Sequence, residues 1–319
     1  MKKKVLLIGG CGYIGGYTSS LFSSKNFDVT VYDNLLYEDR FLKEINFIYG
    51  DIRETDKIVK ISENFDILII MAALVGDPAC SVDQNLTNEI NFESVKRLCE
   101  NIDESVHFIF MSTCSVYGAQ DGLLNEDSPT NPLSTYASTK LMAEEYISKR
   151  KGTIFRLGTV YGLGDNFSRI RMDLVVNVLT MKAISDGEIT INGGEQWRPI
   201  ISVIDIAEYV CEACKNQYEG IFVLSKENVI IKNLGERVAK IIPDTKINYT
   251  EISFQDARNY RVESNKANNT FEYKPVVSVE DEVLRMKNMF DEKRIKNPLQ
   301  AVYHNGKYLS NLKNNEKFK

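Results

Sequence analysis

Tyr136 and Lys140 stand four residues apart in the segment Tyr-Ala-Ser-Thr-Lys. Helical periodicity over residues 134–149, with Ser134 as the expected N-cap, places both side chains on one face of a helix. A tyrosine has a pKa of about 10, so it can act as a base at neutral pH only where a cation stabilises the phenolate. Lys140 could supply that charge, although most Tyr/Lys pairs at this spacing lie on a solvated surface.

Hydroxyl side chains follow the strand expected at 107–111, in the stretch STCSVYG that runs from Ser112 to Gly118. Enzymes with α/β folds bind their ligands at the carboxyl ends of parallel strands. The stretch therefore supports a catalytic role for Tyr136 and Lys140.

A second chemical motif is the glycine series Gly9, Gly12 and Gly15, which follows a short apolar run. Glycine suits such a strand-to-helix turn because the turn is tight, the backbone must approach a pyrophosphate, and helix amides must face the anion. With the intervening Tyr13 and Ile14, these glycines are expected to bind a dinucleotide. A glycine motif alone is a weak signal, but here a predicted strand precedes it and a predicted helix follows.

The second predicted strand, 28–32, ends at Asp33 and Asn34, where dinucleotide-binding folds place a ribose-binding carboxylate. Asp33 could accept hydrogen bonds from both ribose hydroxyls and would repel a 2′-phosphate, and no arginine directly follows it. The predicted cofactor is therefore NAD rather than NADP, with Asp33 and Asn34 as contacts. The alternative is that Asp33 is only a turn residue.

The elements that must position these groups alternate between β-rich runs and amphipathic helical runs through the first half of the chain. Strands are expected at 4–8, 28–32, 46–49, 66–71, 107–111 and 153–157, with helices at 12–24, 54–64, 81–101 and 134–149. Such alternation predicts an α/β fold built on a Rossmann-type, doubly wound parallel sheet.

The pattern loosens after about residue 165. Helices are expected at 173–185 and 205–214, with short strands at 188–192 and 199–203. We predict an NAD-binding domain at 1–165 and about 198–225, and a smaller α/β substrate-binding lobe at 166–197 and 226–290. Residues 291–319, rich in lysine and asparagine, are expected to form a docked or disordered polar tail.

The composition excludes several classes of protein. A chain of 319 residues with 43% hydrophobic and 26% charged residues is globular, and its net charge of −5 argues against a nucleic-acid partner. No apolar stretch is long enough to span a membrane, and the run after the N-terminal lysines is too short for a signal peptide. Six cysteines without a framework spacing fit a reducing cytoplasm, and the isolated Cys211/Cys214 pair predicts no metal site.

Over roughly residues 1–290, the sequence resembles the NAD-dependent epimerase/dehydratase family, the extended short-chain dehydrogenases. The motifs that carry the resemblance occur in the family's order: Gly9/Gly12/Gly15, Asp33, Gly50-Asp51-Ile52, Ala72-Ala73, Asn91, Ser112-Thr113, Tyr117-Gly118, Tyr136/Lys140 and Arg156 through Tyr161-Gly162. The resemblance implies that Tyr136 is the base and that Lys140 supports it and binds the ribose. It also implies that Thr113 binds the reacting sugar oxygen.

The same resemblance implies further contacts with the cofactor. Asp51 and Ile52 would flank adenine, and Ala72 and Ala73 would leave room for the dinucleotide. Asn91 would fix the following helix, although it could equally be a structural residue.

Arginines are the substrate contacts that the resemblance implies. Arg198, in Gln-Trp-Arg-Pro, would clamp the diphosphate of a nucleotide sugar, because a guanidinium can bind phosphate through two hydrogen bonds. Arg258, Arg261 and Arg171 are expected to be further substrate contacts, with Arg169 as an additional candidate. Arg198, Arg258 and Arg261 could instead form surface ion pairs.

Two departures from the family pattern narrow the reaction. Cys114 and Ser115 replace the Asp-Glu pair that follows the catalytic threonine in 4,6-dehydratases, so no carboxylate stands there to eliminate water. Thr159 stands where the family often has asparagine. Together with residues 171–177, it resembles a branch that includes GDP-heptose 4-dehydrogenases.

The resemblance implies C4 oxidation of a GDP- or UDP-linked sugar, by an epimerase or a dehydrogenase of surface-polysaccharide synthesis. A cytoplasmic homodimer, formed through the helices at 81–101 and 134–149, is expected, with no nucleic-acid or membrane partner. Two alternatives stay open: an NADH-dependent reductase of 4-keto nucleotide sugars, and a non-catalytic NAD sensor or scaffold on the same fold. The intact set of Thr113, Tyr136 and Lys140 favours an enzyme.

Overall fold

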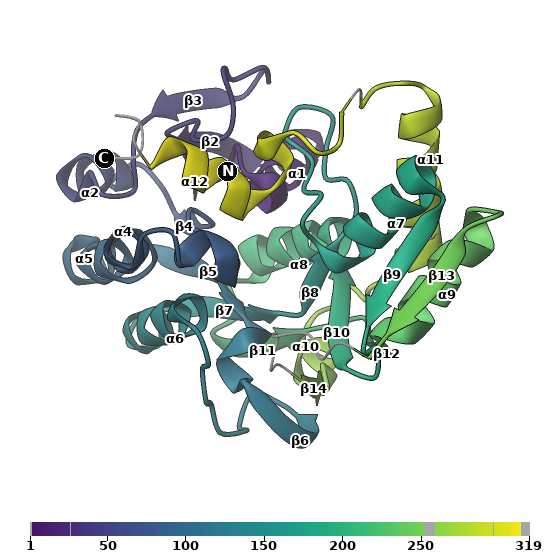
Figure 1. The fold of residues 1–319 in the computed structure, drawn as a ribbon. Coiled ribbons are helices and arrows are strands. Elements are labelled where there is room, and N and C mark those ends of the chain that lie inside the picture. Colours follow the sequence, from purple (N-terminus) through teal and green to yellow (C-terminus); the bar gives the residue numbers. More distant parts are fainter. Residues whose placement is uncertain (1, 26, 252–258, 296, 314–319) are drawn as a thin grey trace.

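The centre of the protein is a seven-stranded parallel sheet. The structure is a computed structural model, which describes residues 2–25, 27–251, 259–295 and 297–313. The strands follow the order β11-β7-β5-β4-β1-β2-β3 (Figure 1). Their bounds are β1 Lys3–Ile8, β2 Phe27–Asp33, β3 Asn46–Tyr49, β4 Ile67–Ile70, β5 His107–Thr113, β7 Gly152–Leu157 and β11 Gly220–Leu224. The chain winds outwards from β1 to β3 and then from β4 to β11, which confirms the predicted Rossmann-type, doubly wound sheet.

The central strands are apolar along their whole length because both faces of the sheet are covered. In β1, Val5, Leu6 and Leu7 are fully buried. Successive side chains point to opposite faces of a strand. Val5 and Leu7 therefore join the hydrophobic core on one side of the sheet, and Leu6 and Ile8 join the core on the other.

Helices cover both faces of the sheet (Figure 1). Phe22 of α1 and Tyr209 of α8 complete the core on one side. Ile58 of α2, Leu98 of α5 and Ala143 of α6 complete the core on the other. The bounds of these helices are α1 Tyr13–Ser24, α2 Thr55–Ser62, α5 Ser94–Asn101, α6 Thr135–Ile147 and α8 Val203–Asn216.

The single helix predicted over 81–101 is wrong in detail, because the segment is broken into shorter pieces. They are α3 Asp77–Cys80, α4 Gln84–Asn88, a π-helical turn Glu89–Glu93 and α5 Ser94–Asn101. Asn91 lies in the π-helical turn, and its side chain bonds to the backbone of Leu74 instead of facing solvent. Single π turns within helices are frequent at functional sites.

A smaller lobe follows the sixth strand of the central sheet. Its strands form the sheets β12-β10-β8 and β13-β9, and its helices α7, α9 and α11 share a separate core with them. The bounds are β8 Thr159–Tyr161, β9 Glu188–Asn192, β10 Trp197–Ser202, β12 Glu227–Ile230, β13 Lys246–Thr250, α7 Val175–Asp186, α9 Ile231–Ile241 and α11 Val279–Asp291. A further pair joins β6 Ala119–Leu124 to β14 Asn259–Val262, and α10 spans Asn265–Thr270.

Two strands that we assigned to the NAD-binding domain, β8 and β10, belong to the smaller sheet instead. Residues 198–202, which we assigned to the NAD-binding domain, belong to β10, and β10 pairs with β8 and β12 of the smaller sheet. Within 198–225, α8 packs on the central sheet and β11 pairs with β7 of that sheet. The remainder of the division stays a prediction.

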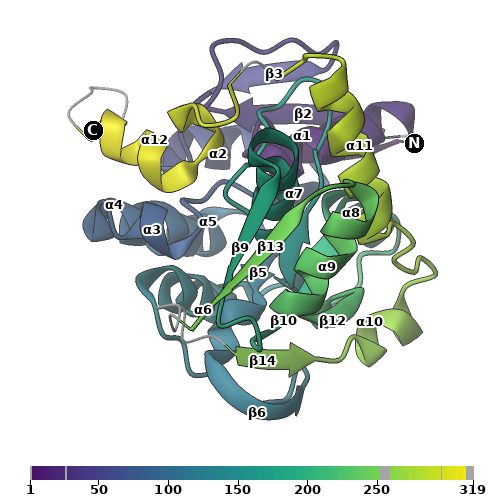
Figure 2. The same ribbon diagram turned by 45° about the vertical axis from the view of Figure 1, so that its right-hand side comes forward.

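The described part of the C-terminal tail docks on the body of the protein. It contains a 3-10 turn at Ala301–Tyr303 and the helix α12 at Asn305–Leu312, which lies near α3 and α4 (Figure 2). Leu309 of α12 is fully buried and joins the core formed with α2, α5 and α6. Within the described ranges, no helix is both long and apolar enough to cross a membrane.

Candidate active site

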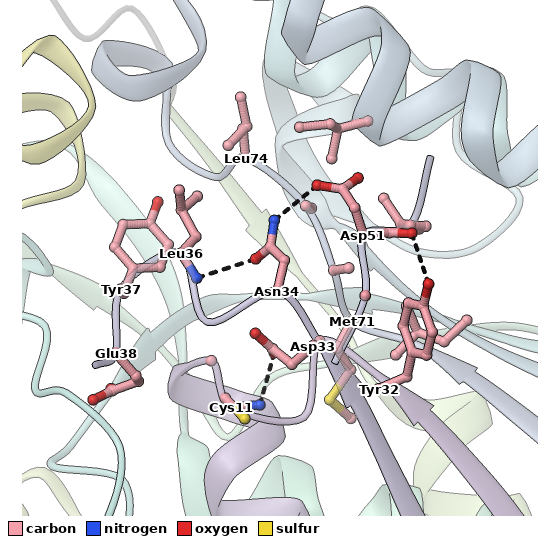
Figure 3. Close-up of a pocket in the computed structure, with 18 residues that line it drawn as sticks. Cys11, Tyr32, Asp33, Asn34, Leu36, Tyr37, Glu38, Asp51, Met71 and Leu74 are labelled. Atoms are coloured by element: carbon pink, nitrogen blue, oxygen red, sulfur yellow. Dashed lines mark hydrogen bonds between the residues drawn. The ribbon is translucent and has the colours of Figure 1, made fainter. Parts of the chain in front are cut away.

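A pocket opens at the carboxyl ends of β1, β2 and β4, beside the point where the strand order reverses (Figure 3). Eight of the predicted cofactor residues line it, namely Gly9, Gly12, Asp33, Asn34, Asp51, Ile52, Ala72 and Ala73. The other lining residues are Ile8, Cys11, Tyr32, Leu36, Tyr37, Glu38, Gly50, Met71, Leu74 and Ile90. This is the place where open α/β sheets bind nucleotides.

Glycine stands at the three positions of the first turn for different physical reasons. Gly9 has a φ of +86°, and a Cβ there would lie 2.3 Å from the Ala72 nitrogen. A Cβ at Gly15 would lie 2.2 Å from the Gly9 carbonyl oxygen, so the helix could not pack this close to the strand. At Gly12 the nearest atom would be 3.4 Å away, so packing within the protein does not require glycine there. Its openness instead fits the approach of a phosphate to the backbone.

The start of α1 supplies donors for that phosphate. No side chain caps this helix at Gly12, so its first amides lack a partner from a capping side chain. Tyr13 does not line the pocket, because its buried hydroxyl donates to the Gly162 carbonyl at 2.6 Å. Ile14 packs against the core. Tyr13 and Ile14 could therefore reach a cofactor only through their backbone.

Asp33 supplies a carboxylate to the pocket beside the glycine turn. Asp33 accepts hydrogen bonds from the Cys11 amide at 2.9 Å and the Leu35 amide at 2.7 Å (Figure 3). Burial raises the pKa of Asp33, and these two hydrogen bonds oppose the rise. Each carboxylate oxygen keeps capacity to accept another hydrogen bond, which fits a pair of ribose hydroxyls.

Asn34 and Asp51 form the rim of the pocket beside Asp33. The Asn34 amide donates to Asp51 at 2.8 Å, and Arg53 pairs with Asp51 at 2.8 Å. Although burial acts to raise it, the pKa of Asp51 is lowered by the bonds from Arg53 and Asn34. The glycine turn, Asp33 and this rim together fit a dinucleotide without a 2′-phosphate.

Helix α6 presents the predicted catalytic pair. Ser134 caps it by accepting a hydrogen bond from the Ala137 amide at 3.3 Å. Tyr136 lies close enough to Thr113, at the end of β5, for the threonine hydroxyl to act on the pKa of the phenol. Burial raises the pKa of Tyr136 to about 12, while the nearby Thr113 hydroxyl and the charge of Arg171 act to lower it.

Lys140 lies one turn further along α6 and is only 2% exposed. Its ammonium lies 4.0 Å from the centroid of the Phe110 ring on β5. Burial lowers the pKa of Lys140 to about 7, and the charge of Glu144 opposes this shift. At neutral pH, the ammonium and amine forms are therefore present in comparable amounts.

Glu144, which our sequence analysis missed, lies one further turn along the same helix. It accepts a hydrogen bond from Ser112 and pairs with Arg156 at 2.7 Å. The signal that could have revealed it is its spacing, because Tyr136, Lys140 and Glu144 recur every four residues.

Asn91 ties the catalytic helix to the wall of the pocket. Its side chain accepts from the Leu74 amide at 2.8 Å and donates to the Leu74 carbonyl at 2.9 Å. Its amide also reaches the Thr139 hydroxyl at 3.5 Å, on the turn of α6 between Tyr136 and Lys140. Asn91 therefore holds the loop after β4 and contacts α6.

The predicted substrate arginines fall into two places. Arg171 follows β8, pairs with Asp173 at 2.9 Å and lies near Tyr136. Arg198 of β10 is buried and donates to the Trp197 carbonyl at 2.8 Å, and the guanidinium of Arg261 lies 5.2 Å from the Trp197 ring centroid. Arg258 lies outside the described residues.

Cys114 and Ser115, the two residues that follow Thr113, carry no carboxylate. Cys114 is fully buried, and its thiol donates to the Arg156 carbonyl at 3.3 Å. Burial raises the pKa of Cys114, so it packs as a neutral thiol. Cys211 and Cys214 are buried in the core, and among the described residues no cluster of three or more His, Cys, Asp or Glu side chains could hold a metal ion.

Comparison with known proteins gives concordant matches. The model of the NAD dependent epimerase/dehydratase family matches residues 5–224. The UDP-glucose 4-epimerase of Rhizobium meliloti (strain 1021) is 30% identical over 151 residues, 44% of this chain and 45% of that protein. The UDP-glucose 4-epimerase of Lactobacillus helveticus is 30% identical over 215 residues, 60% of this chain and 64% of that protein. The chain thus spans about half to two thirds of the length of these curated relatives.

Solved structures share the fold over nearly the whole chain. A UDP-glucuronic acid 4-epimerase from Bacillus cereus, in complex with UDP-glucuronic acid and NAD, superposes with a TM-score of 0.77 at 24% identity. That match covers 91% of this chain and 99% of the other. At this level of identity the likeness concerns the fold.

Proposed function

This chain belongs to the NAD-dependent epimerase/dehydratase family, and from that premise we propose that it oxidises a nucleotide-activated sugar at C4. The observation that carries the proposal is the approach of Tyr136 to the Thr113 hydroxyl, with Lys140 one turn along the same helix. The cofactor of the family is NAD, and the glycine turn and Asp33 are the residues that would hold it.

Tyr136 would accept the proton of the C4 hydroxyl, and Thr113 would bind the same oxygen. Bound NAD supplies a nicotinamide ring that can take a hydride from C4 and return it. Tyr136 needs assistance, because burial raises its pKa to about 12. The ammonium form of Lys140 would stabilise the phenolate, and the positive charge of Arg171 also acts to lower the pKa of Tyr136.

Elimination of water is disfavoured as the next step. That reaction needs an acid and a base beside the sugar, a pair of carboxyl groups in 4,6-dehydratases, and Cys114 and Ser115 carry no carboxyl group. Glu144 does not replace them, because it is buried and already pairs with Arg156. The 4-keto sugar would then either be reduced again with inversion, as in an epimerase, or released, as in a dehydrogenase.

The nucleotide sugar would extend from Tyr136 to the smaller lobe. Arg198 and Arg261 lie beside Trp197 there, and guanidinium groups suit a diphosphate. A UDP- or GDP-linked sugar fits this chemistry. By the sequence resemblance we further propose a cytoplasmic homodimer that serves surface-polysaccharide synthesis.

A panel of UDP- and GDP-linked sugars tests the function. Purified protein with NAD is incubated with each sugar, and proton NMR follows the signal at C4 while absorbance follows NADH. Inversion at C4 without net NADH identifies an epimerase, and stoichiometric NADH identifies a dehydrogenase. Tight NAD binding without conversion of any sugar would favour the sensor or scaffold.

A further inference from the structure

Residues 297–313 span two walls of the dinucleotide pocket, and we name this segment the C-terminal strap. One wall is the loop after β2, where Leu36 and Tyr37 line the pocket, and the other is the loop after β4. The Tyr308 hydroxyl of α12 donates to the Leu36 carbonyl at 3.0 Å, and its ring centroid lies 5.2 Å from that of Tyr37. The strap is therefore fixed to the first wall.

Asn305, the first residue of α12, fixes the strap to the second wall and to the smaller lobe. Its side-chain amide donates to the Val75 carbonyl at 2.9 Å, and its side-chain oxygen accepts from Arg169. Its backbone N–H donates to Asp173 at 2.9 Å. Because Asn305 is only 1% exposed, removal of its side chain would leave the Val75 carbonyl and the Arg169 guanidinium without this buried partner, while the backbone bond to Asp173 would stay.

Arg169 is a buried cation that contacts Tyr37, a residue of the pocket lining. Its guanidinium lies 3.6 Å from the centroid of the Tyr37 ring and donates to the Val302 carbonyl of the strap at 2.8 Å. Within the part of the chain that the structure describes, no carboxylate forms an ion pair with it. Burial lowers its pKa to about 10, so it stays charged at neutral pH. Such a charge suits a pocket for an anionic dinucleotide.

The strap also reaches the catalytic end of the site. Asp173, which Asn305 holds through its backbone N–H, pairs with Arg171 at 2.9 Å. Arg171 in turn lies near enough to Tyr136 to lower the pKa of its phenol. One contact at Asn305 thus joins the strap to both the pocket and the residues around Tyr136.

We propose that the C-terminal strap closes the dinucleotide pocket and retains NAD(H), with Asn305 as the residue that positions it. The proposal rests on the proposed function in assigning NAD(H) to this pocket. Because the strap bonds to both walls, these bonds would have to break before the two walls could move apart. Slow exchange suits an enzyme that removes a hydride and returns it to the same sugar, since one cofactor molecule must stay bound throughout.

The rate at which NADH leaves the full-length protein tests the strap. Protein loaded with NADH is mixed with a large excess of NAD, and stopped-flow fluorescence follows the loss of bound NADH. We expect release to be faster by roughly 10-fold or more in Asn305→Ala, and several-fold faster in Tyr308→Phe. Asn311→Ala is the matched control, because it makes the same change at an exposed position of α12, and it should keep the wild-type rate.

Release at the wild-type rate in both strap variants would overturn the proposal. Circular dichroism establishes that each variant is folded. If Asn305→Ala does not fold, Tyr308→Phe decides, because it removes only one hydroxyl. The test does not depend on the sugar. If the strap variants release NADH faster but the protein converts no sugar, the proposed reaction is wrong and the proposed role of the strap is supported. If the protein converts a sugar but the variants release NADH at the wild-type rate, the reaction is supported and the role of the strap is wrong.

Discussion

The Glu144 carboxylate pairs with the Arg156 guanidinium at 2.7 Å, and the two side chains are only 3% and 5% exposed. Glu144 also accepts a hydrogen bond from Ser112 at the end of β5. The pair therefore fastens α6 to β5 and β7, beneath Tyr136 and Lys140. The negative charge of Glu144 favours the ammonium form of Lys140, which the proposed chemistry needs.

Replacing Glu144 with glutamine should lower the free energy of unfolding by about 3–5 kcal/mol, because Arg156 would remain as a buried charge without its counter-ion. Urea denaturation followed by circular dichroism measures the change. Glu145→Gln makes the same change at the next, exposed position of α6 and should stay within about 0.5 kcal/mol of wild type. Equally small effects of both changes would contradict a structural role for the buried pair.

Lys140 should make the stability of the cofactor-free protein depend on pH. Burial lowers the pKa of Lys140 from 10.5 to about 7 in the folded chain. Between these values the unfolded chain binds more protons, so the free energy of unfolding should rise with pH, by about 1.5 kcal/mol from pH 7 to 8.5. Denaturation curves at the two pH values measure this rise.

The control for that measurement separates Lys140 from other titrating groups. Lys140→Met should lack the rise, whereas Lys151→Met, at an exposed position, should keep it. An identical pH dependence in wild type and Lys140→Met would show that the Lys140 ammonium is not destabilised by burial.

Asp33 should make the protein prefer NAD to NADP. Its carboxylate would face the 2′-position of the ribose and repel a phosphate there. Asp33→Ser should narrow the difference between the two affinities, and it should also weaken NAD binding, because two backbone amides lose their acceptor. Titration calorimetry measures both affinities. Equal binding of NAD and NADP by the wild type would show that Asp33 does not contact the ribose.

Arg198→Ala should weaken nucleotide-sugar binding by about 1.5–3 kcal/mol, the loss expected for a hydrogen bond to a charged group. NAD affinity should change little, because Arg198 does not line the dinucleotide pocket. Calorimetry with each ligand measures the difference. Arg237→Ala is the control within the same lobe, because its guanidinium already pairs with Glu227 and Glu280. Equal loss of both ligands in Arg198→Ala would indicate a structural role.

The central sheet could be predicted because its strands are continuous apolar runs, a local property of the sequence. The break in the helix predicted over 81–101 could not, because it depends on Asn91 bonding to Leu74 across the fold. Periodicity records which residues are apolar, and it does not record where one polar side chain finds its partner. The pairing of β10 with the smaller sheet escaped the prediction for a similar reason, since strand partners are set by topology.

The candidate site also contains residues that could be predicted from the sequence and residues that could not. Tyr136 and Lys140 could be found because their spacing is local, and the same interval would have revealed Glu144. Asn305 and Tyr308 carry no local signal. Their partners Val75 and Leu36 lie 230 and 272 residues away in sequence. Only the folded chain brings the polar tail to the pocket.

Tyr136→Phe should separate binding from chemistry. The change removes the hydroxyl that would accept the proton and keeps the ring, so NAD and sugar should still bind while hydride transfer falls by about 10²–10⁴-fold. With the cognate sugar deuterated at C4, the wild type should give deuterated NADH if it is a dehydrogenase, or return deuterium to C4 of the inverted sugar if it is an epimerase. Mass spectrometry of both products locates the label. Near-normal turnover in Tyr136→Phe, or deuterium that stays on an unreacted C4 while another ring position exchanges, would exclude Tyr136 as the base for C4 oxidation.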